Sequence, residues 1–415
     1  MSPIEVKDVA HPAANVSSSW TVRFAENERS GGLVMGGTFG GRALTSIDLE
    51  FIAKRVVEEF RAAPCAAVAA AIHEHGQWRY GIGAFGRLAF EERAALASST
   101  TIFDLASVTK PVIALVMARL QRRQILHRDE RLGDVVESIR GTLSEDAPLD
   151  LIAAHRAGLS GHVPLYQALV DNREFILDVA FRQAANARRV ECASPIPNEG
   201  FAPVYSDMGY LLLGRALESR TKLTLDNLVE REVSAILGLR IHSAATWRQR
   251  DPAFDANVAP TEVVSWRGGL VSGAVHDENA WAFSASGVSG HAGLFGDAGS
   301  VAKLGVAIVD AIRGRSDWLR PEDVEPLIRT RQGGSLRAGF DGRSGDAPSS
   351  GTRFGRHTFG HLGFTGTSLW IDPERELVGV LLTNRVHPTR ESLAIRAARP
   401  AAYDAMAEAI VSVDP

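Results

Sequence analysis

The feature that most constrains the fold is the position of the strand patterns, which occur near both ends of this 415-residue chain. AAVAAAIH and WRYGIGAFG, joined by the turn EHGQ, predict a hairpin of two strands before residue 90. Strand patterns return in HLGFTGTSLWID and LVGVLLTN, after residue 360. Between them helical patterns dominate, as in PVIALVMARLQRR, GYLLLGRALESRT and VAKLGVAIVDAIR. We therefore predict an α+β fold, with one sheet built from both termini, flanking helices and an inserted α-helical region.

The predicted domain organisation follows from this order of patterns. Residues 1–44 are rich in Gly and Ser with weak periodicity, so we expect a poorly structured lead-in. Residues 45–412 are expected to form a single domain, with a sheet region at about 45–105 and 355–412 and a mainly helical region at about 106–330. Residues 331–357 combine many Gly, Ser and Arg residues with few large apolar side chains, which predicts a flexible surface loop.

A helix is expected at the start of this domain, capped by Thr45 or Ser46 and running through IDLEFIAKRVVEEF. Its apolar side chains recur at helical spacing and predict one buried face, formed by Ile47, Phe51, Ile52, Val56 and Phe60. A last helix is expected in ESLAIRAARPAAYDAMAEAIV.

Composition excludes several classes of function. The 45 basic and 49 acidic residues give a net charge of −4, which lacks the basic field that nucleic-acid binding needs. No run approaches 18 apolar residues, and the first residues lack the pattern of a secretory signal, so we expect a cytoplasmic protein with no membrane span. Cys65 and Cys192 have no metal-type spacing and no disulfide pattern. We expect no cofactor and no metal, and the oligomeric state is not indicated.

The most informative segment is FDLASVTKPVIALVMARL, in which Ser107 and Lys110 stand three residues apart. At this spacing the two side chains share one face of a helix and can touch. The apolar residues that follow predict a buried helix, and only five of the 45 basic residues of this chain are lysines, so a buried lysine needs a reason. Burial and the positive end of the helix dipole would lower the pKa of Lys110 and let its neutral amine accept the serine proton. A chance S-x-x-K pattern in a structural helix is the alternative.

Two further motifs carry polar groups that can serve such a serine. Tyr205-Ser206-Asp207 precedes the helical pattern GYLLLGRALE, so that Tyr205 can share the serine proton; alternatively, Asp207 is a helix N-cap and Tyr205 packs on the core. His361-Leu362-Gly363 lies on the first C-terminal strand, where a glycine on an edge allows close approach of a substrate. The N–H of Phe364 is then a candidate oxyanion donor beside the N–H of Ser107.

These motifs, S-x-x-K, Y-S-D and H-x-G in this order, resemble the class C β-lactamase-like serine hydrolases. That family includes penicillin-binding DD-peptidases, family VIII-type esterases and related amidases and acyltransferases. DLASVTKP, VYSDMGYLLLG, GHAGLFGDA, GHLGFTGTSLWIDPE and VLLTNRVHP carry the resemblance, over roughly residues 46–412. The resemblance implies a β-lactamase/transpeptidase-like fold with an antiparallel sheet.

The same resemblance implies functional roles, with Ser107 as the acylated nucleophile, Lys110 as its activating base and Tyr205 as proton shuttle. Asp207, His361 and Gly363 are the expected substrate-binding residues. Two positions depart from the family pattern: Asp207 replaces the usual Asn, and Leu362 lacks the usual hydroxyl. A carboxylate at 207 would hold Lys110 or pair with an incoming ammonium, and Leu362 weakens the case for β-lactams or free carboxylates as substrates.

We therefore predict a serine hydrolase acting on a small-molecule ester, amide or peptide through an acyl-serine intermediate. β-Lactamase, DD-peptidase or muropeptide amidase activity is the alternative, and a non-catalytic ligand-binding relative is an alternative of another class. A metallohydrolase is not supported, because no recognised ligand spacing occurs among the histidines. The segment VHDENAWAFSASGVSGHAGLFG leaves two interpretations open: His276, Asp277, Asn279 and His291 shape the pocket, or they satisfy a tight loop.

Overall fold

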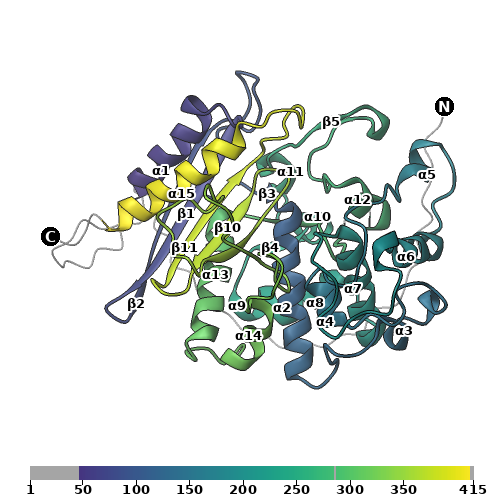
Figure 1. Cartoon of the computed structure of the whole chain (residues 1–415). Coiled ribbons are helices and arrows are strands. Elements are labelled where there is room, and N and C mark those ends of the chain that lie inside the picture. Colours follow the sequence, from purple (N-terminus) through teal and green to yellow (C-terminus); the bar gives the residue numbers. More distant parts are fainter. Residues whose placement is uncertain (1–45, 285–286, 412–415) are drawn as a thin grey trace, which may run out of the picture. The chain divides into compact units, whose positions relative to one another are not determined.

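The centre of the fold is a sheet of six strands in the order β2-β1-β11-β10-β9-β8, which places the first strands beside the last ones. A computed structural model describes residues 46–284 and 287–411, so the predicted lead-in and Thr45 lie outside the described residues. The strands are Cys65–Glu74 (β1), Gln77–Gly86 (β2), Asp341–Gly342 (β8), Phe359–Leu362 (β9), Ser368–Asp372 (β10) and Leu377–Thr383 (β11). All neighbours pair antiparallel, so the predicted sheet built from both termini is confirmed (Figure 1).

Strand β1 explains how the sheet is buried on both faces. Its side chains alternate between two apolar clusters, with Ala67 and Ala69 in one and Ala66 and Val68 in the other. Helices α1 (Ser46–Lys54) and α15 (Ile395–Val411) pack on one face, and α13 (Ala298–Ile312) packs on the other. A near-continuous run of small apolar residues is what a central strand covered on both faces requires.

The inserted region between β2 and β8 is mainly helical, as predicted. Besides α13, its longest helices are α2 (Thr109–Arg122), α6 (Leu177–Asn186) and α7 (Asp207–Thr221). The shorter ones are α3 (Leu132–Val135), α4 (Leu149–Ala153), α5 (Gln167–Val170), α8 (Leu225–Val229), α9 (Ala235–Leu237), α10 (Ala244–Arg250), α11 (Phe254–Asn257), α12 (Glu278–Ser284) and α14 (Pro321–Ile328). Within the described residues, none of the helices has the length and apolar character to cross a lipid bilayer.

Short strands inside this region tie it together. Strand β7 (Leu294–Gly296) pairs with β3 (Phe103–Asp104) on one side and with β4 (Ile241–Ser243) on the other. A separate hairpin joins β5 (Val263–Val264) and β6 (Gly269–Leu270). The pairing of β3 with β7 fixes the chain just before Ser107.

Two predictions need correction. In the first helix Ile52 and Val56 are buried as predicted, but Phe51 is 62% exposed, because the buried face is completed by Leu49 and Phe51 lies outside it. The loop 331–357 is not simply a surface segment. Phe340 is buried, and Arg331 makes a buried bidentate ion pair with the carboxylate of Asp150 in α4. An aromatic ring and a buried ion pair anchor a segment whose composition alone looked solvated.

Candidate active site

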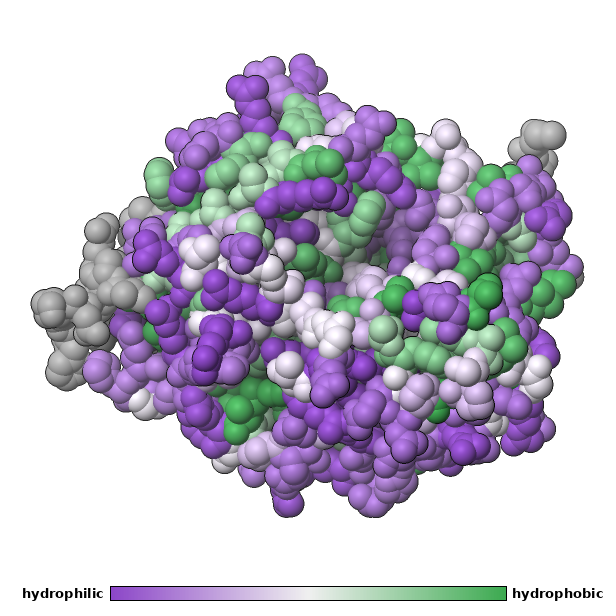
Figure 2. Space-filling view, in the orientation of Figure 1, coloured by the Kyte–Doolittle hydropathy of each residue, from purple (hydrophilic) through white to green (hydrophobic). Residues whose placement is uncertain are grey.

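Ser107 lies where the chain turns from strand β3 into the buried helix α2. It occupies a 3₁₀ turn, Ala106–Val108, immediately before that helix. Ala106 has a φ of 47°, in the left-handed region, and its N–H donates to Asp104 Oδ1 at 2.8 Å. This turn is strained at Ala106 and is held by the hydrogen bond to Asp104. It presents a half-buried serine at the N-terminus of a helix. Figure 2 shows the surface hollowed between the sheet and the helical region in this orientation.

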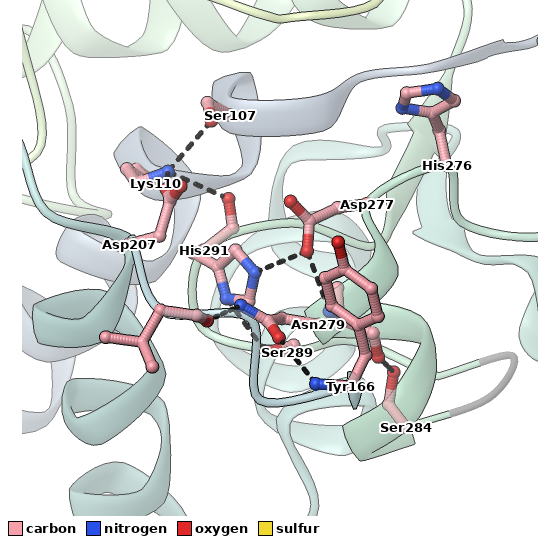
Figure 3. A network of polar contacts seen from close by, with 12 residues as sticks. Ser107, Lys110, Tyr166, Asp207, His276, Asp277, Asn279, Ser284, Ser289 and His291 are labelled. Atoms are coloured by element: carbon pink, nitrogen blue, oxygen red, sulfur yellow. Dashed lines mark hydrogen bonds and ion pairs between the residues drawn. The ribbon is translucent and has the colours of Figure 1, made fainter. Parts of the chain in front are cut away.

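Lys110 is completely buried and uses all three of its donors inside the protein. Its Nζ donates to Ser107 Oγ at 2.8 Å, to Asp207 Oδ1 at 2.7 Å and to the His291 carbonyl oxygen at 3.1 Å (Figure 3). The predicted contact between Ser107 and Lys110 is therefore present. The carboxylate at 207 holds the lysine, which is the first of the two roles considered for it.

The pKa of Lys110 differs from the expectation. Burial lowers it, but the Asp207 carboxylate and the Tyr205 phenol raise it by more, so the pKa lies above that of a free lysine. Lys110 is therefore an ammonium that donates to Ser107. The expected lowering fails because the Asp207 carboxylate and the Tyr205 phenol together outweigh the effect of burial.

The ring of Tyr205 packs between two histidine rings and lies over Lys110. Its ring centroid lies 4.9 Å from that of His155 and 5.9 Å from that of His361, and Lys110 Nζ lies 4.8 Å from it. Burial raises the pKa of the Tyr205 phenol, and its hydrogen bonds to Lys110 and Ser107 act in the opposite direction. The phenol is thus protonated and within reach of both groups.

The start of α7 is capped by a neighbour of the candidate residues. Ser206, not Asp207, is the N-cap: its Oγ accepts from Gly209 N at 3.2 Å, and its own N–H donates to His155 Nδ1 at 3.0 Å. The alternative that Asp207 serves as a cap is therefore wrong. Because Ser206 takes this role, Asp207 is free to bind Lys110.

His361 and Gly363 lie at the end of β9, where the sheet edge is open. Strand β8 pairs only with Phe359 and Gly360, so His361 and the residues after it have no β8 partner in the described part of the sheet. The His361 ring nitrogen Nδ1 lies 2.8 Å from the Leu362 carbonyl oxygen. Burial lowers the pKa of His361 to about 3, with the Lys110 charge acting in the same direction. The ring is therefore neutral at pH 7.

The turn after β9 is fastened to the chain that precedes the serine. Thr365 Oγ1 donates to the Asp104 carbonyl oxygen at 2.8 Å, and Thr367 Oγ1 donates to the Leu105 carbonyl oxygen at 2.9 Å. A Cβ on Gly363 would lie 2.7 Å from the Leu105 carbonyl oxygen, so glycine is required for this approach. The turn that carries Phe364 is thereby held beside Ser107.

Two main-chain donors remain available at this point. Neither the Ser107 N–H nor the Phe364 N–H has a hydrogen-bond acceptor within the described part of the chain. The Phe364 ring is 48% exposed and stacks on His276, with ring centroids 5.7 Å apart. Free N–H groups beside a serine are what an oxyanion site requires.

The segment 276–291 contributes more than the sequence indicated. Asp277 Oδ1 lies 2.8 Å from His291 Nε2, and His291 Nδ1 lies 3.1 Å from Ser289 Oγ (Figure 3). His291 then accepts from Lys110 through its carbonyl oxygen, a main-chain role that no side-chain motif could reveal. Asn279 instead binds the 163–166 loop, accepting from Tyr166 N at 3.1 Å. His291 thus contacts the candidate site, whereas Asn279 joins this segment to the 163–166 loop.

Other groups complete the surroundings of the site. His155, which no sequence motif singles out, packs against Tyr205 and accepts from the Ser206 N–H. His276 Nε2 lies 3.0 Å from Glu262 Oε2, away from Lys110. Across the described residues, no group of three His, Cys, Asp or Glu side chains is arranged to hold a metal ion.

Comparison with known proteins identifies relatives on both sequence and structure. A family model described as beta-lactamase matches residues 53–403. A protein of Escherichia coli (strain K12) named "Putative D-alanyl-D-alanine carboxypeptidase" is 28% identical over 323 residues, covering 71% of this chain and 72% of that protein. An N-acetylmuramyl-L-alanine amidase of Bacillus subtilis (strain 168) is 29% identical over 326 residues, covering 71% and 70%.

Solved structures share the fold at lower identity. EstCE1, described as a hydrolase with promiscuous acyltransferase activity, has a TM-score of 0.62 at 20% identity and covers 86% of this chain and 98% of its own. A class C beta lactamase from Rhodobacter sphaeroides has a TM-score of 0.60 at 16% identity and covers 88% and 99%. The predicted β-lactamase/transpeptidase-like fold is confirmed.

Proposed function

Since this chain belongs to the beta-lactamase family and is a serine hydrolase of that family, we propose that Ser107 is its nucleophile. The enzyme cleaves an ester or amide of a small molecule through an acyl-serine intermediate. The observation that carries this proposal is the hydrogen bond of 2.8 Å between Ser107 and the buried Lys110. An enclosed lysine touching a serine at a helix N-terminus is the arrangement that activates a hydroxyl group.

Acylation begins with attack of Ser107 Oγ on the substrate carbonyl carbon. The new C–O bond converts the carbonyl oxygen to an oxyanion, which the N–H groups of Ser107 and Phe364 stabilise. The serine proton passes to Lys110 when that amine is neutral. Tyr205, whose phenol lies close to both Ser107 and Lys110, relays the proton to the leaving nitrogen or oxygen as its bond to the acyl carbon breaks.

The protonation state of Lys110 controls this step. Asp207 keeps the lysine charged in the resting enzyme, so the reactive form is the fraction in which its proton has left. Water then attacks the acyl-serine, and the same groups act in reverse to release the acid. The rate of acylation is therefore expected to rise with pH.

We further propose that the substrate is an amide or ester whose leaving group bears no free carboxylate near the serine. Asp207 and Asp277 place two carboxylates around Lys110, and Leu362 offers no hydroxyl. The similarity to an N-acetylmuramyl-L-alanine amidase supports an amide of the muramyl type. Peptides ending in D-Ala-D-Ala are the second candidate, because of the similarity to the Escherichia coli protein.

A substrate panel tests both parts of the proposal. Purified protein is assayed with p-nitrophenyl butyrate, a muramyl-L-alanine peptide, a D-Ala-D-Ala peptide and nitrocefin, with Ser107→Ala as the blank. We expect turnover of the ester and the muramyl amide, and cleavage of the D-Ala-D-Ala peptide slower by roughly 10-fold or more. Turnover that persists in Ser107→Ala contradicts the nucleophile, and faster D-Ala-D-Ala cleavage contradicts the substrate class.

The same assay separates the other classes of protein. A non-catalytic relative would turn over none of the four substrates. A metallohydrolase would lose activity with a chelator and keep it in Ser107→Ala, whereas the proposed mechanism predicts the opposite for both treatments.

A further inference from the structure

Arg399 is a buried cation with no acidic partner. It lies in α15, is 9% exposed, and pairs with none of the Asp or Glu side chains in the described part of the chain. Its Nη2 donates instead to the Gly363 carbonyl oxygen at 2.8 Å and to the Thr367 carbonyl oxygen at 3.2 Å. Burial lowers the pKa of Arg399 to about 10. Holding an unpaired charge in the interior is costly, so its position needs an explanation.

The carbonyl group that Arg399 binds belongs to the same peptide unit as the candidate oxyanion donor. A trans peptide is planar, so its C=O and N–H point in opposite directions. An arginine on the Gly363 oxygen therefore fixes the direction of the Phe364 N–H, which points away from α15. The Gly366 N–H also donates to the Gly363 oxygen, at 3.1 Å, and closes the turn.

The chain just before the nucleophile also lies against this turn. The same turn is tied to residues 104 and 105 by Thr365 and Thr367, and Ser107 follows two residues later. Contact between Gly363 and the Leu105 carbonyl oxygen leaves no room for a side chain. The turn that contains this peptide is thus held both by Arg399 and by the residues just before Ser107.

The following peptide is held by a second arginine. Arg385 Nε donates to the Phe364 carbonyl oxygen at 2.7 Å, and its guanidinium lies 4.4 Å from the centroid of the Phe364 ring. The carbonyl groups on either side of Phe364 Cα, those of Gly363 and of Phe364 itself, are therefore both bound by arginine side chains. This leaves the N–H as the unbound polar group of the residue.

From these contacts we propose that Arg399 is a positioning residue for the oxyanion site: it orients the Gly363–Phe364 peptide and polarises it. A cation on the carbonyl oxygen draws electron density through the amide and makes the N–H a stronger donor. The oxyanion of the tetrahedral intermediate then meets a donor that is already aligned. This inference rests on the proposed function, because it assigns a role in stabilising the intermediate formed at Ser107.

The experiment compares wild type with Arg399→Lys, Arg399→Gln and Arg399→Met. Lysine keeps a cation, glutamine keeps a neutral donor, and methionine keeps neither. We expect kcat/KM for p-nitrophenyl butyrate to fall in that order, with Met lower than wild type by roughly 10- to 100-fold, less than loss of a whole oxyanion donor. The fall is expected in kcat rather than in KM.

Arg337→Met is the matched control. Arg337 is also 9% exposed and also donates to a main-chain carbonyl group, that of Ile328 at 2.7 Å, but it contacts none of the candidate catalytic residues. Its substitution is expected to lower the melting temperature and leave kcat within about twofold, a change small on the scale of tenfold per 1.36 kcal/mol.

Infrared spectra of the trapped acyl-enzyme measure the stretching frequency of the ester carbonyl group. A purely structural role of Arg399 in packing would not change this frequency. In wild type the ester carbonyl stretch is expected at lower frequency than in Arg399→Met, because a strong donor polarises that carbonyl. Equal frequencies and equal kcat would overturn the inference while leaving the acyl-serine mechanism intact. Absence of any acyl-enzyme in wild type would overturn both. Should Arg399→Met not fold, identical kcat values for Arg399→Lys and Arg399→Gln would overturn the inference.

Discussion

The groups on the helix side of Ser107 and those on its sheet side differ in charge. On the helix side, Lys110 is an ammonium bound by the Asp207 carboxylate. The Asp277 carboxylate contacts the ring of His291, whose carbonyl oxygen accepts from Lys110. On the sheet side, the groups that face the serine are neutral: a main-chain N–H and the ring of His361, whose pKa burial lowers to about 3. We call these the helix-side groups (Lys110, Asp207, Asp277 and His291) and the sheet-side groups (His361, Gly363, Phe364 and Arg399).

This difference matches two separate demands of acyl transfer. Proton transfer needs titratable groups whose pKa values neighbouring charges can set, and the helix side provides them. Stabilising an oxyanion needs fixed donors that cannot neutralise it by giving up a proton, and main-chain N–H groups provide that. Substitutions on the helix side should therefore change how the rate depends on pH. Substitutions on the sheet side should change the rate at every pH.

The largest effect is expected from Lys110→Arg. Arginine keeps the positive charge but cannot lose its proton near neutral pH, so it cannot accept the serine proton. We expect the rate of acylation, followed by release of p-nitrophenol, to fall by roughly 10²- to 10⁴-fold.

Lys303→Arg, at an exposed position on α13, is the matched control and should leave the rate unchanged. A Lys110→Arg enzyme that is folded by circular dichroism and within tenfold of wild type would show that Lys110 is not the base.

Gly363→Ala tests the sheet side directly. The new Cβ would lie 1.9 Å from Thr367 Oγ1 and 2.7 Å from the Leu105 carbonyl oxygen, so the turn must move. We expect kcat/KM to fall by about 100-fold, the scale of losing one oxyanion donor, with no shift in its pH midpoint.

Gly209→Ala provides the comparison, because its Cβ finds only ordinary contacts, 3.4 Å and more from its neighbours, in a helix close to the same site. Activity of this variant should stay near that of wild type. If both glycine variants behave alike, close approach at Gly363 is not what matters.

Asp207→Asn should move the pH dependence. The Asp207 carboxylate raises the pKa of Lys110, so a neutral amide removes that effect and the pKa falls. A neutral lysine is then available at lower pH, and the midpoint of the rise in kcat/KM should move down by about 1–3 pH units. Rates measured from pH 5 to 11 for the variant and wild type give both midpoints, and a midpoint that stays or moves up would contradict the assignment.

The smallest effect is expected on stability in acid. The pKa of His361 is lowered to about 3, so between that pH and its ordinary value of 6.5 the unfolded chain binds a proton that the folded chain does not. The free energy of unfolding therefore falls as pH drops through this range. His361→Gln should be less sensitive, as measured by urea denaturation at pH 7 and pH 4.5.

His357→Gln is the control, because the side chain of His357 is 52% exposed in the preceding loop. It should follow the wild-type pH dependence. An unchanged acid sensitivity in His361→Gln would mean that other groups carry it.

Much of the fold and part of the site could be predicted from the sequence, because their signals are local. The i, i+3 spacing of Ser107 and Lys110 at the head of an apolar run is one such signal, and the strand patterns at both ends are another. Phe51 shows the limit of periodicity: two residues of the predicted face, Ile52 and Val56, are buried, but Leu49 packs there and Phe51 does not.

The remaining features depend on distant residues and leave no local pattern. Arg399 lies 292 positions after Ser107, inside a helix whose sequence predicts only packing, and it acts through a main-chain carbonyl. His291 likewise holds Lys110 through its backbone. The raised pKa of Lys110 required knowing that Asp207 touches it, since burial alone predicts the opposite sign.

The most direct test of the acyl-serine mechanism is mass spectrometry of the protein quenched during turnover of p-nitrophenyl butyrate. We predict one butyryl adduct, found after digestion on the peptide that contains Ser107 and absent from Ser107→Ala. Turnover without an adduct, or an adduct on another residue that persists in Ser107→Ala, would contradict the mechanism.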